Sequence, residues 1–124
     1  MENHLLKNEG LIQRIALVVL AILISIGLIL LGVHRLQLSD PYIRTVLSLQ
    51  GDAVQGHAIF QMNCAGCHGL EADGRVGPSL RKVADRKSKF HLIHQVISGQ
   101  TPPMPQFQPT PQEMADLLSY LESL

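Results

Sequence analysis

The stretch Cys64-Ala65-Gly66-Cys67-His68 determines how the rest of the chain is interpreted. Two cysteines separated by two residues and followed at once by a histidine form the Cys-x-x-Cys-His pattern of covalent c-type haem attachment. Each thiol can add to one vinyl group of a single porphyrin, and the adjacent imidazole can then bind the iron. Ala65 and Gly66 are small enough for the backbone to lie close to the flat ring. We therefore predict one covalently bound haem c, attached through Cys64 and Cys67, with His68 as the proximal iron ligand.

Three other interpretations of this stretch are weaker. A zinc site would need a second pair of ligands at similar spacing, and Cys64 and Cys67 are the only cysteines in the chain. A thioredoxin-like redox pair would need a βαβ context, which the sequence does not show. A structural disulfide would leave His68 without a role.

A long apolar segment near the N-terminus predicts a membrane anchor. Residues 1–14 form a short polar lead, and the 19 residues from Ile15 to Val33 then carry no charge. A helix of that length spans about 28 Å, close to the roughly 30 Å of a bilayer's hydrocarbon core. A cleaved signal peptide is the main alternative, but the run exceeds the usual apolar length of about 7–15 residues and no Ala-x-Ala site follows. We expect one uncleaved span that contacts lipid through residues 15–33.

The charges beside this span do not orient it. Lys7 and Arg14 precede it, and Arg35 and Arg44 follow it, so the positive-inside count is two against two.

Residues 34–51 are predicted to link the anchor to a second domain. Ser39-Asp40-Pro41 is a typical helix start, with proline at the first helical position. A short amphipathic helix should follow and end near Gly51. The sequence does not decide whether this helix lies on the membrane surface or on the second domain.

Residues 52–124 are predicted to form an all-α haem domain with three main helices. The first should begin after Asp52, with Gly56 at a close helix approach and Val54, Ala58, Ile59 and Phe60 as its apolar positions. The second should cover residues 89–98, between a Ser88 cap and a Gly99 stop. The third should follow the capping box Thr110-Pro111-Gln112-Glu113. A domain of about 75 residues has only a marginal core, so we expect the haem to contribute much of its stability.

Met104 is the predicted second axial ligand. It lies in Pro-Pro-Met-Pro, a stiff segment 36 residues after His68, and its prolines reduce the entropy lost on presenting one side chain. A thioether opposite a histidine raises the reduction potential of the iron. The weaker candidates are the other methionines of the domain and two histidines of its second helix: Met62, Met114, His91 and His94.

These motifs together resemble class I cytochromes c over residues 52–124. They occur in the family's order: Gly56-x-x-x-Phe60, Cys64 to His68, Gly77-Pro78-Ser79-Leu80, Met104-Pro105 and Leu117-x-x-Tyr120. The resemblance implies that the first and last helices cross, with Gly56 and Phe60 meeting Leu117 and Tyr120. It also implies that the Pro78 carbonyl accepts a hydrogen bond from the second ring nitrogen of His68.

The whole chain is also similar to the small membrane-bound cytochrome cM group of cyanobacteria. The shared features are the Asp40-Pro41-Tyr42 start, Gln100-Thr101-Pro102-Pro103-Met104-Pro105 and one uncleaved anchor. This resemblance implies a single-pass protein whose haem domain lies on the lumenal or periplasmic side of the thylakoid or plasma membrane. Covalent haem attachment outside the cytoplasm, a property of the family, agrees with that side.

The predicted function is transfer of single electrons between membrane redox complexes of respiration or photosynthesis, without enzyme activity. No acid–base or nucleophile constellation accompanies the haem motif, and a net charge of +0 gives no support for nucleic-acid binding. The implied partners are transient redox proteins, namely a terminal oxidase or photosynthetic electron-transfer proteins. The alternatives are a ligand-sensing or peroxidase-like haem protein and a haem-bearing subunit of a terminal oxidase.

Overall fold

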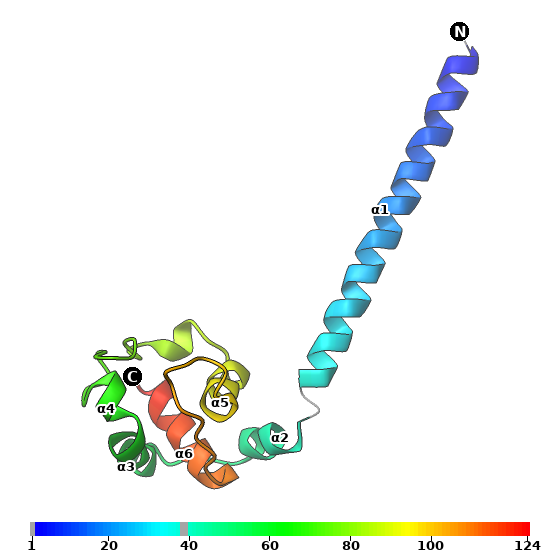
Figure 1. Ribbon diagram of the computed structural model, residues 1–124. Coiled ribbons are helices and arrows are strands. Elements are labelled where there is room, and N and C mark those ends of the chain that lie inside the picture. Colours follow the sequence, from blue (N-terminus) through cyan, green and yellow to red (C-terminus); the bar gives the residue numbers. More distant parts are fainter. Residues whose placement is uncertain (1, 38–39) are drawn as a thin grey trace. The chain divides into compact units, whose positions relative to one another are not determined.

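The computed structural model describes the backbone of residues 2–37 and 40–124, with side chains from Gly10 to Leu36 and from Asp40 onward. The chain divides into two compact units, Met1–Ser39 and Asp40–Leu124 (Figure 1). None of the described residues lies in a β-strand. The predicted all-α class is confirmed.

The first unit is one long helix, α1, over Glu2–Gln37. Its stretch Gly10–Leu36 has a mean hydropathy of 3.1 and could cross a membrane by length and composition. Large apolar side chains are exposed all round its described part. The Ser25 hydroxyl donates to the Ala21 carbonyl at 2.8 Å, so the one serine of the apolar run is satisfied within the helix.

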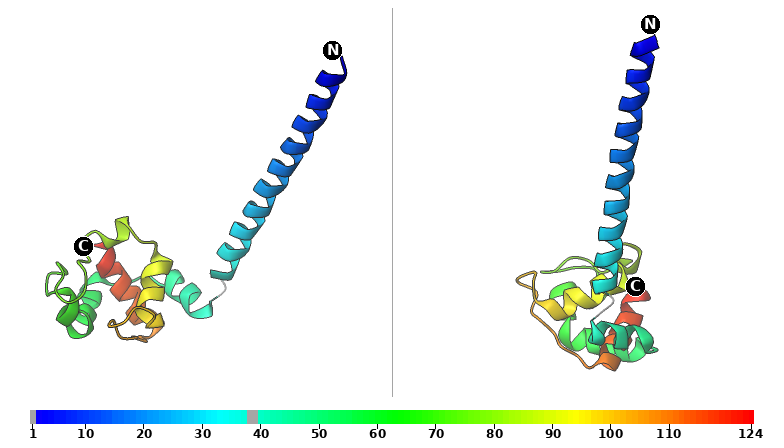
Figure 2. Two further views of the ribbon diagram at one scale, coloured as in Figure 1. Left: turned by 45° about the horizontal axis from the view of Figure 1, so that its top comes forward. Right: turned by 90° about the vertical axis from the view of Figure 1, so that its right-hand side faces the viewer.

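The second unit is built on a crossing of two helices, α3 over Ala53–Asn63 and α6 over Pro111–Glu122 (Figures 1 and 2). Gly56 lies where the backbones meet, because a Cβ there would collide with the Asp116 carbonyl and lie 2.9 Å from Cβ of Tyr120. The Phe60 ring is fully buried, with its centroid 5.2 Å from that of Tyr120. This is the crossing that the family resemblance implied.

The remaining elements of the second unit follow local signals in the sequence. Its other helices are α2 over Pro41–Ser48, α4 over Ala65–His68, the 3-10 turn η1 over Val83–Asp85 and α5 over Lys89–Ser98. Side chains of Asp40, Asp52, Ser88 and Thr110 accept hydrogen bonds from the first backbone amides of α2, α3, α5 and α6. Gly99 ends α5 in the left-handed region, at φ +61°. The predicted caps, the capping box and the bounds of α5 are confirmed.

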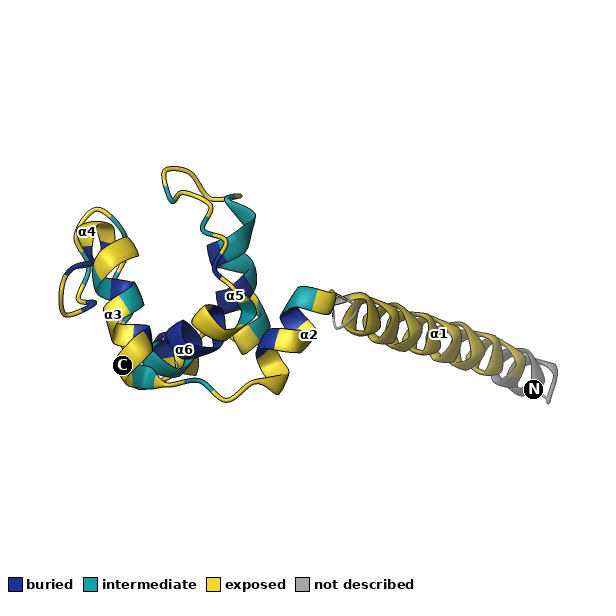
Figure 3. Cartoon of the chain, turned by 90° about the horizontal axis from the view of Figure 1, so that it is seen from below, coloured by how far each residue is buried: buried dark blue, intermediate teal, exposed yellow. Residues whose placement is uncertain are grey.

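Helix α2 packs against the other helices of the second unit. The sequence had not decided between this position and one on the membrane surface. Ile43 and Val46 are each 1% exposed, and the helix contacts α5 and α6 (Figure 3). The Tyr42 hydroxyl donates to the Pro109 carbonyl at 2.9 Å. The helix ends at Ser48, before Gly51, which instead lies where the chain passes the Ala115 carbonyl too closely for a side chain.

Two of the four apolar positions predicted for α3 are not inside. Val54 is 75% exposed and Ala58 is exposed as well. Gly56 and Phe60 are four residues apart and share the face toward α6. Val54 precedes Gly56 by two residues, about 200° around the helix, so it points away from that face.

Asp116 is buried in α6, which the sequence pattern did not predict. One of its carboxylate oxygens accepts from the Asp52 backbone amide and from the Gln112 side chain, each at 2.9 Å. The carboxylate thereby joins the start of α3 to α6, and a buried polar group that is bonded in this way is tolerated in a core.

Candidate haem site

The two thiols and the imidazole lie on one short helical turn. Cys64 ends α3 and begins α4, and its carbonyl accepts from the amides of Cys67 at 3.1 Å and His68 at 3.0 Å. Both cysteines are free; Cys64 is half-buried and Cys67 is exposed. Burial, and secondarily the neighbouring Cys67, raises the pKa of the Cys64 thiol to about 11. The side chains that the motif requires are therefore presented together, with Cys64 in its neutral form.

The His68 ring is held in one orientation. Its Nδ1 lies 2.8 Å from the Pro78 carbonyl oxygen. A carbonyl only accepts, so Nδ1 carries the proton and Nε2 keeps the lone pair that an iron ligand needs. Gly77 lies against the ring, because a Cβ there would be 2.7 Å from Cε1 and 2.9 Å from Nδ1. The geometry that the resemblance implied for Pro78 is present.

Backbone hydrogen bonds fold the following loop onto α4. We call residues 64–80 the His68 segment. Gly74 donates to the His68 carbonyl at 2.8 Å, Gly77 to the Cys67 carbonyl at 2.7 Å, and Leu80 to the Ala72 carbonyl at 2.9 Å. The position of the imidazole is thus set mainly by backbone groups of its own segment.

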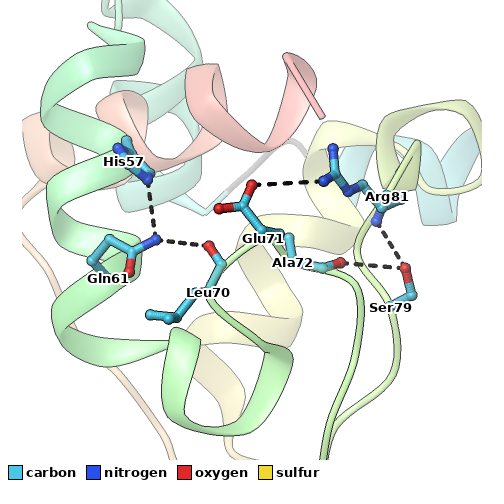
Figure 4. A network of polar contacts seen from close by, with 7 residues as sticks. All are labelled: His57, Gln61, Leu70, Glu71, Ala72, Ser79 and Arg81. Atoms are coloured by element: carbon cyan, nitrogen blue, oxygen red, sulfur yellow. Dashed lines mark hydrogen bonds and ion pairs between the residues drawn. The ribbon is translucent and has the colours of Figure 1, made fainter.

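Side-chain contacts support the outer side of the His68 segment (Figure 4). The Gln61 amide donates to the Leu70 carbonyl at 2.8 Å and lies 3.0 Å from Nε2 of His57. Arg81 pairs with Glu71 at 3.8 Å. A hollow of about 500 Å³ lies on this outer side and is lined by Gln61, Ala65, Gly66, Gly69, Leu70, Glu71, Asp73, Gly74 and Arg75. Ala65 and Gly66 of the haem motif line it, whereas His68 and Met104 do not.

Met104 lies in the irregular segment between α5 and α6, residues 99–109, which we call the Met104 loop. Its side chain is half-buried and packs against the core cluster. The amide of Gln95 on α5 donates to Sδ at 3.5 Å. The Phe107 amide donates to the Val96 carbonyl at 3.0 Å, which brings the loop back alongside α5.

The other candidates for the second ligand are engaged elsewhere or point to solvent. Met114 is 1% exposed in the core, whereas Met62 is 76% exposed. His91 is exposed and lies 3.1 Å from the Ser88 hydroxyl, and the His94 ring stacks on Phe90 with centroids 5.8 Å apart. Met104 remains the candidate that the surroundings favour.

The residues present fit a covalently bound haem. Figure 3 shows α4, which carries His68, and α5, which precedes the Met104 loop, on opposite sides of the unit, with α6 between them. The α4 side carries two thiols and an imidazole with a free Nε2 lone pair. The loop after α5 carries the thioether of Met104. Several apolar side chains of both sides are only half-buried: Ile59, Leu80, Phe90, Ile97 and Phe107. Such a donor set with incompletely covered apolar groups suits a flat apolar ring that binds iron.

Sequence analysis missed the polar side chain that contacts the predicted sulfur ligand. Gln95 lies on α5 among apolar positions, nine residues before Met104, and no motif marks it. Its half-buried state depends on the path of the Met104 loop, which the prolines restrict but do not specify.

Known proteins resemble this chain in sequence and fold. The family described as "Cytochrome C oxidase, cbb3-type, subunit III" matches residues 51–121. A "Cytochrome c-553-like" protein of Synechocystis is 57% identical over 102 residues, which are 82% of this chain and 97% of that protein. "Cytochrome c-551" of Bacillus subtilis is 29% identical over 72 residues, which are 58% of this chain and 63% of that protein. The crystal structure of cytochrome cL from Hyphomicrobium denitrificans is alike in fold, with a TM-score of 0.50 and 24% identity over 66% of this chain and 50% of that one.

Proposed function

Because this chain belongs to the cytochrome c family and carries haem c, we propose that it is a membrane-anchored carrier of single electrons between redox proteins. Haem c supplies the reversible one-electron chemistry of iron. The polypeptide attaches the group, provides its axial ligands and limits access of solvent to it.

The observation that supports the proposal is the way in which the two candidate axial donors, His68 and Met104, are held by their neighbours. Pro78 fixes the His68 tautomer at a distance of 2.8 Å, and Gln95 holds the Met104 sulfur at 3.5 Å. A histidine with an opposing methionine leaves no open position for substrate or gas and raises the reduction potential. That arrangement favours electron transfer over ligand binding. Cys64 and Cys67 would hold the ring covalently on the His68 side.

Residues 15–33 are proposed to span the bilayer, with residues 34–51 linking the span to the haem domain, residues 52–124. The support is the apolar stretch of α1, which is long enough to cross a membrane. Haem attachment to c-type cytochromes outside the cytoplasm favours the lumenal or periplasmic side for the domain. The Synechocystis relative favours a thylakoid or plasma membrane, and therefore respiration or photosynthesis.

The partners are proposed to be transient redox proteins, a terminal oxidase or photosynthetic electron-transfer proteins. Redox proteins usually bury only a small interface when they meet. An anchored carrier meets its partners within the membrane plane. Basic side chains exposed after the His68 segment could steer an acidic partner. Two of these basic groups are partly neutralised by ion pairs within the domain: Arg81 pairs with Glu71, and Lys89 pairs with Glu122 at 2.8 Å. Lys82 and Lys87 form no ion pair among the described residues.

The test of this proposal is the substitution Met104→Ala in the full-length, haem-loaded protein. We expect the haem to stay attached, the visible spectrum to change and the reduction potential to fall, because a ligand to the iron is lost. The matched control is Met62→Ala, which removes an exposed methionine of the same domain. If Met104→Ala leaves the spectrum and the potential unchanged, Met104 is not a ligand, and the proposal that the iron has no open position is wrong.

A second candidate function is a haem-bearing subunit of a terminal oxidase, which the description of the matched family favours. An oxidase subunit should stay in stoichiometric complex with oxidase polypeptides after extraction in mild detergent. A mobile carrier should separate from them and still exchange electrons.

A further inference from the structure

We infer that Gln95 is a positioning residue that fixes the Met104 thioether and sets its strength as a donor to iron. The inference rests on the proposed role of Met104. The Gln95 amide nitrogen lies 3.5 Å from Sδ of Met104, and its amide oxygen lies 3.4 Å from the Thr101 hydroxyl. Both ends of one half-buried amide are therefore used beside the predicted ligand.

The chemistry of the neighbours determines which end of the amide faces the sulfur. A thioether accepts hydrogen bonds but has no proton to donate, so only the NH₂ group can bond to Met104. The Thr101 hydroxyl can donate, and it meets the amide oxygen. The Thr101 carbonyl also accepts from the Met104 backbone amide at 3.0 Å. Thr101 thus orients the Gln95 amide and closes the turn that presents the sulfur.

This hydrogen bond leaves the thioether able to bind iron. Sulfur has two lone pairs, and the amide of Gln95 occupies one of them. The N–H group also withdraws electron density from the sulfur, which makes the thioether a weaker donor. Oxidised iron depends more on that donation than reduced iron does, so the bond favours the reduced state and raises the potential. In addition, Gln95 restricts a side chain with three rotatable bonds.

The alternative is that Gln95 merely ties the Met104 loop to α5. The chain offers a matched control for this, because Gln106 ties the same loop to the same helix. Its amide donates to the Ile97 carbonyl at 2.8 Å, and no described contact joins it to Met104. Gln95→Leu removes a hydrogen bond between loop and helix that involves the Met104 sulfur. Gln106→Leu removes one that does not involve the sulfur.

The experiment compares these two variants in the full-length, haem-loaded protein in detergent. In a redox titration, Gln95→Leu should shift the ratio of oxidised to reduced protein about threefold toward oxidised, roughly 28 mV for a one-electron couple. Carbon monoxide should bind the reduced Gln95→Leu protein several-fold faster, because the thioether is less restricted. Gln106→Leu should match the unaltered protein in both measurements.

Two outcomes overturn the inference: an unchanged potential in Gln95→Leu, or equal shifts in both glutamine variants. If Gln95→Leu does not fold, Thr101→Val decides, since it removes only the hydroxyl that orients the amide. A lower potential in Thr101→Val than in Gln106→Leu supports the inference, and equal potentials overturn it. Failure of the proposed function has a different signature, which is an unchanged spectrum in Met104→Ala.

Discussion

The His68 segment and the Met104 loop carry the two proposed axial ligands, and different kinds of hydrogen bond predominate in the two. In the His68 segment, backbone amides of Gly74 and Gly77 donate to backbone carbonyls of α4, and a backbone carbonyl orients the imidazole. The Met104 loop has a backbone hydrogen bond to α5, from Phe107 to Val96, and other hydrogen bonds to neighbouring helices involve the side chains of Gln95, Gln106 and Tyr42. The position of the His68 ring therefore depends on the backbone conformation of its segment, whereas the position of the Met104 side chain can be changed by substituting a single side chain.

The largest expected effect comes from Cys64→Ser combined with Cys67→Ser, which removes the haem attachment. We expect helices α2 to α6 to be largely lost, because neither set of hydrogen bonds should compensate for the apolar surface and the covalent link that the haem provides. Circular dichroism and thermal melting of the full chain measure this. Retention of native helical content and melting temperature without haem would show that the hydrogen bonds suffice alone.

The next effect tests the backbone-built side. In Gly77→Ala the new methyl group would lie 2.7 Å from the His68 ring, which would have to move away from the Pro78 carbonyl. We expect a loss of about 1–3 kcal/mol in the free energy of unfolding, together with a changed haem spectrum. The control is Val76→Ala in the same segment, which shortens a side chain that is 73% exposed. Equal stabilities for the two variants would contradict the tight fit at His68.

A smaller effect tests the side-chain hydrogen bonds of the Met104 loop. Tyr42→Phe removes the hydroxyl that bonds the Pro109 carbonyl at the end of the Met104 loop, and it should cost about 1 kcal/mol in denaturant unfolding. Burial, with lesser contributions from Glu113 and Asp40, raises the pKa of Tyr42, so the hydroxyl remains a donor at neutral pH. Tyr120→Phe is the control, because no described hydrogen bond uses the Tyr120 hydroxyl. No difference between the two variants would mean that the Pro109 bond contributes nothing.

The smallest effect is a pH dependence at the cap that follows the Met104 loop. Glu113 accepts from the Thr110 backbone amide at 2.7 Å and from its hydroxyl at 2.8 Å, and these bonds lower the pKa of the carboxyl below its ordinary value of 4.5. A lowered pKa in the folded state stabilises the protein above pH 4.5, and this contribution is lost as the pH falls through the folded value. The stability advantage over Glu113→Gln should therefore shrink between pH 6 and pH 3. An advantage that is constant over this range would contradict the assignment.

Local features of the site and fold could be predicted from the sequence because short patterns encode them. The haem motif needs five consecutive residues, and the caps of α3, α5 and α6 need one or two residues each. The bond from His68 to Pro78 was expected only through the family resemblance. It joins residues ten positions apart, and no periodicity specifies it.

Contacts between distant segments could not be predicted in the same way. The packing of α2, the buried Asp116 and the bond from Gln95 to Met104 each depend on where a second segment lies. A polar residue on a helix is ordinarily assigned to solvent, and Asp116 is an exception only because the start of α3 presents an unbonded amide to it. The exposure of Val54 shows the same dependence, since the direction of α6 decides which face of α3 is covered.

The crossing of α3 and α6 also has a consequence for how the domain forms during synthesis. The bond between Asp52 and Asp116 joins residues 64 positions apart. Closing a loop of that size costs roughly 1.6 kcal/mol more in chain entropy than closing one of about 10 residues. Because a chain is made from its N-terminus, α3 and the two cysteines that follow it emerge well before α6, the helix that packs on α3. The half-buried thiol of Cys64, at the end of α3, is therefore reachable in an open chain until α6 has formed, which gives haem attachment an interval before α6 packs on α3.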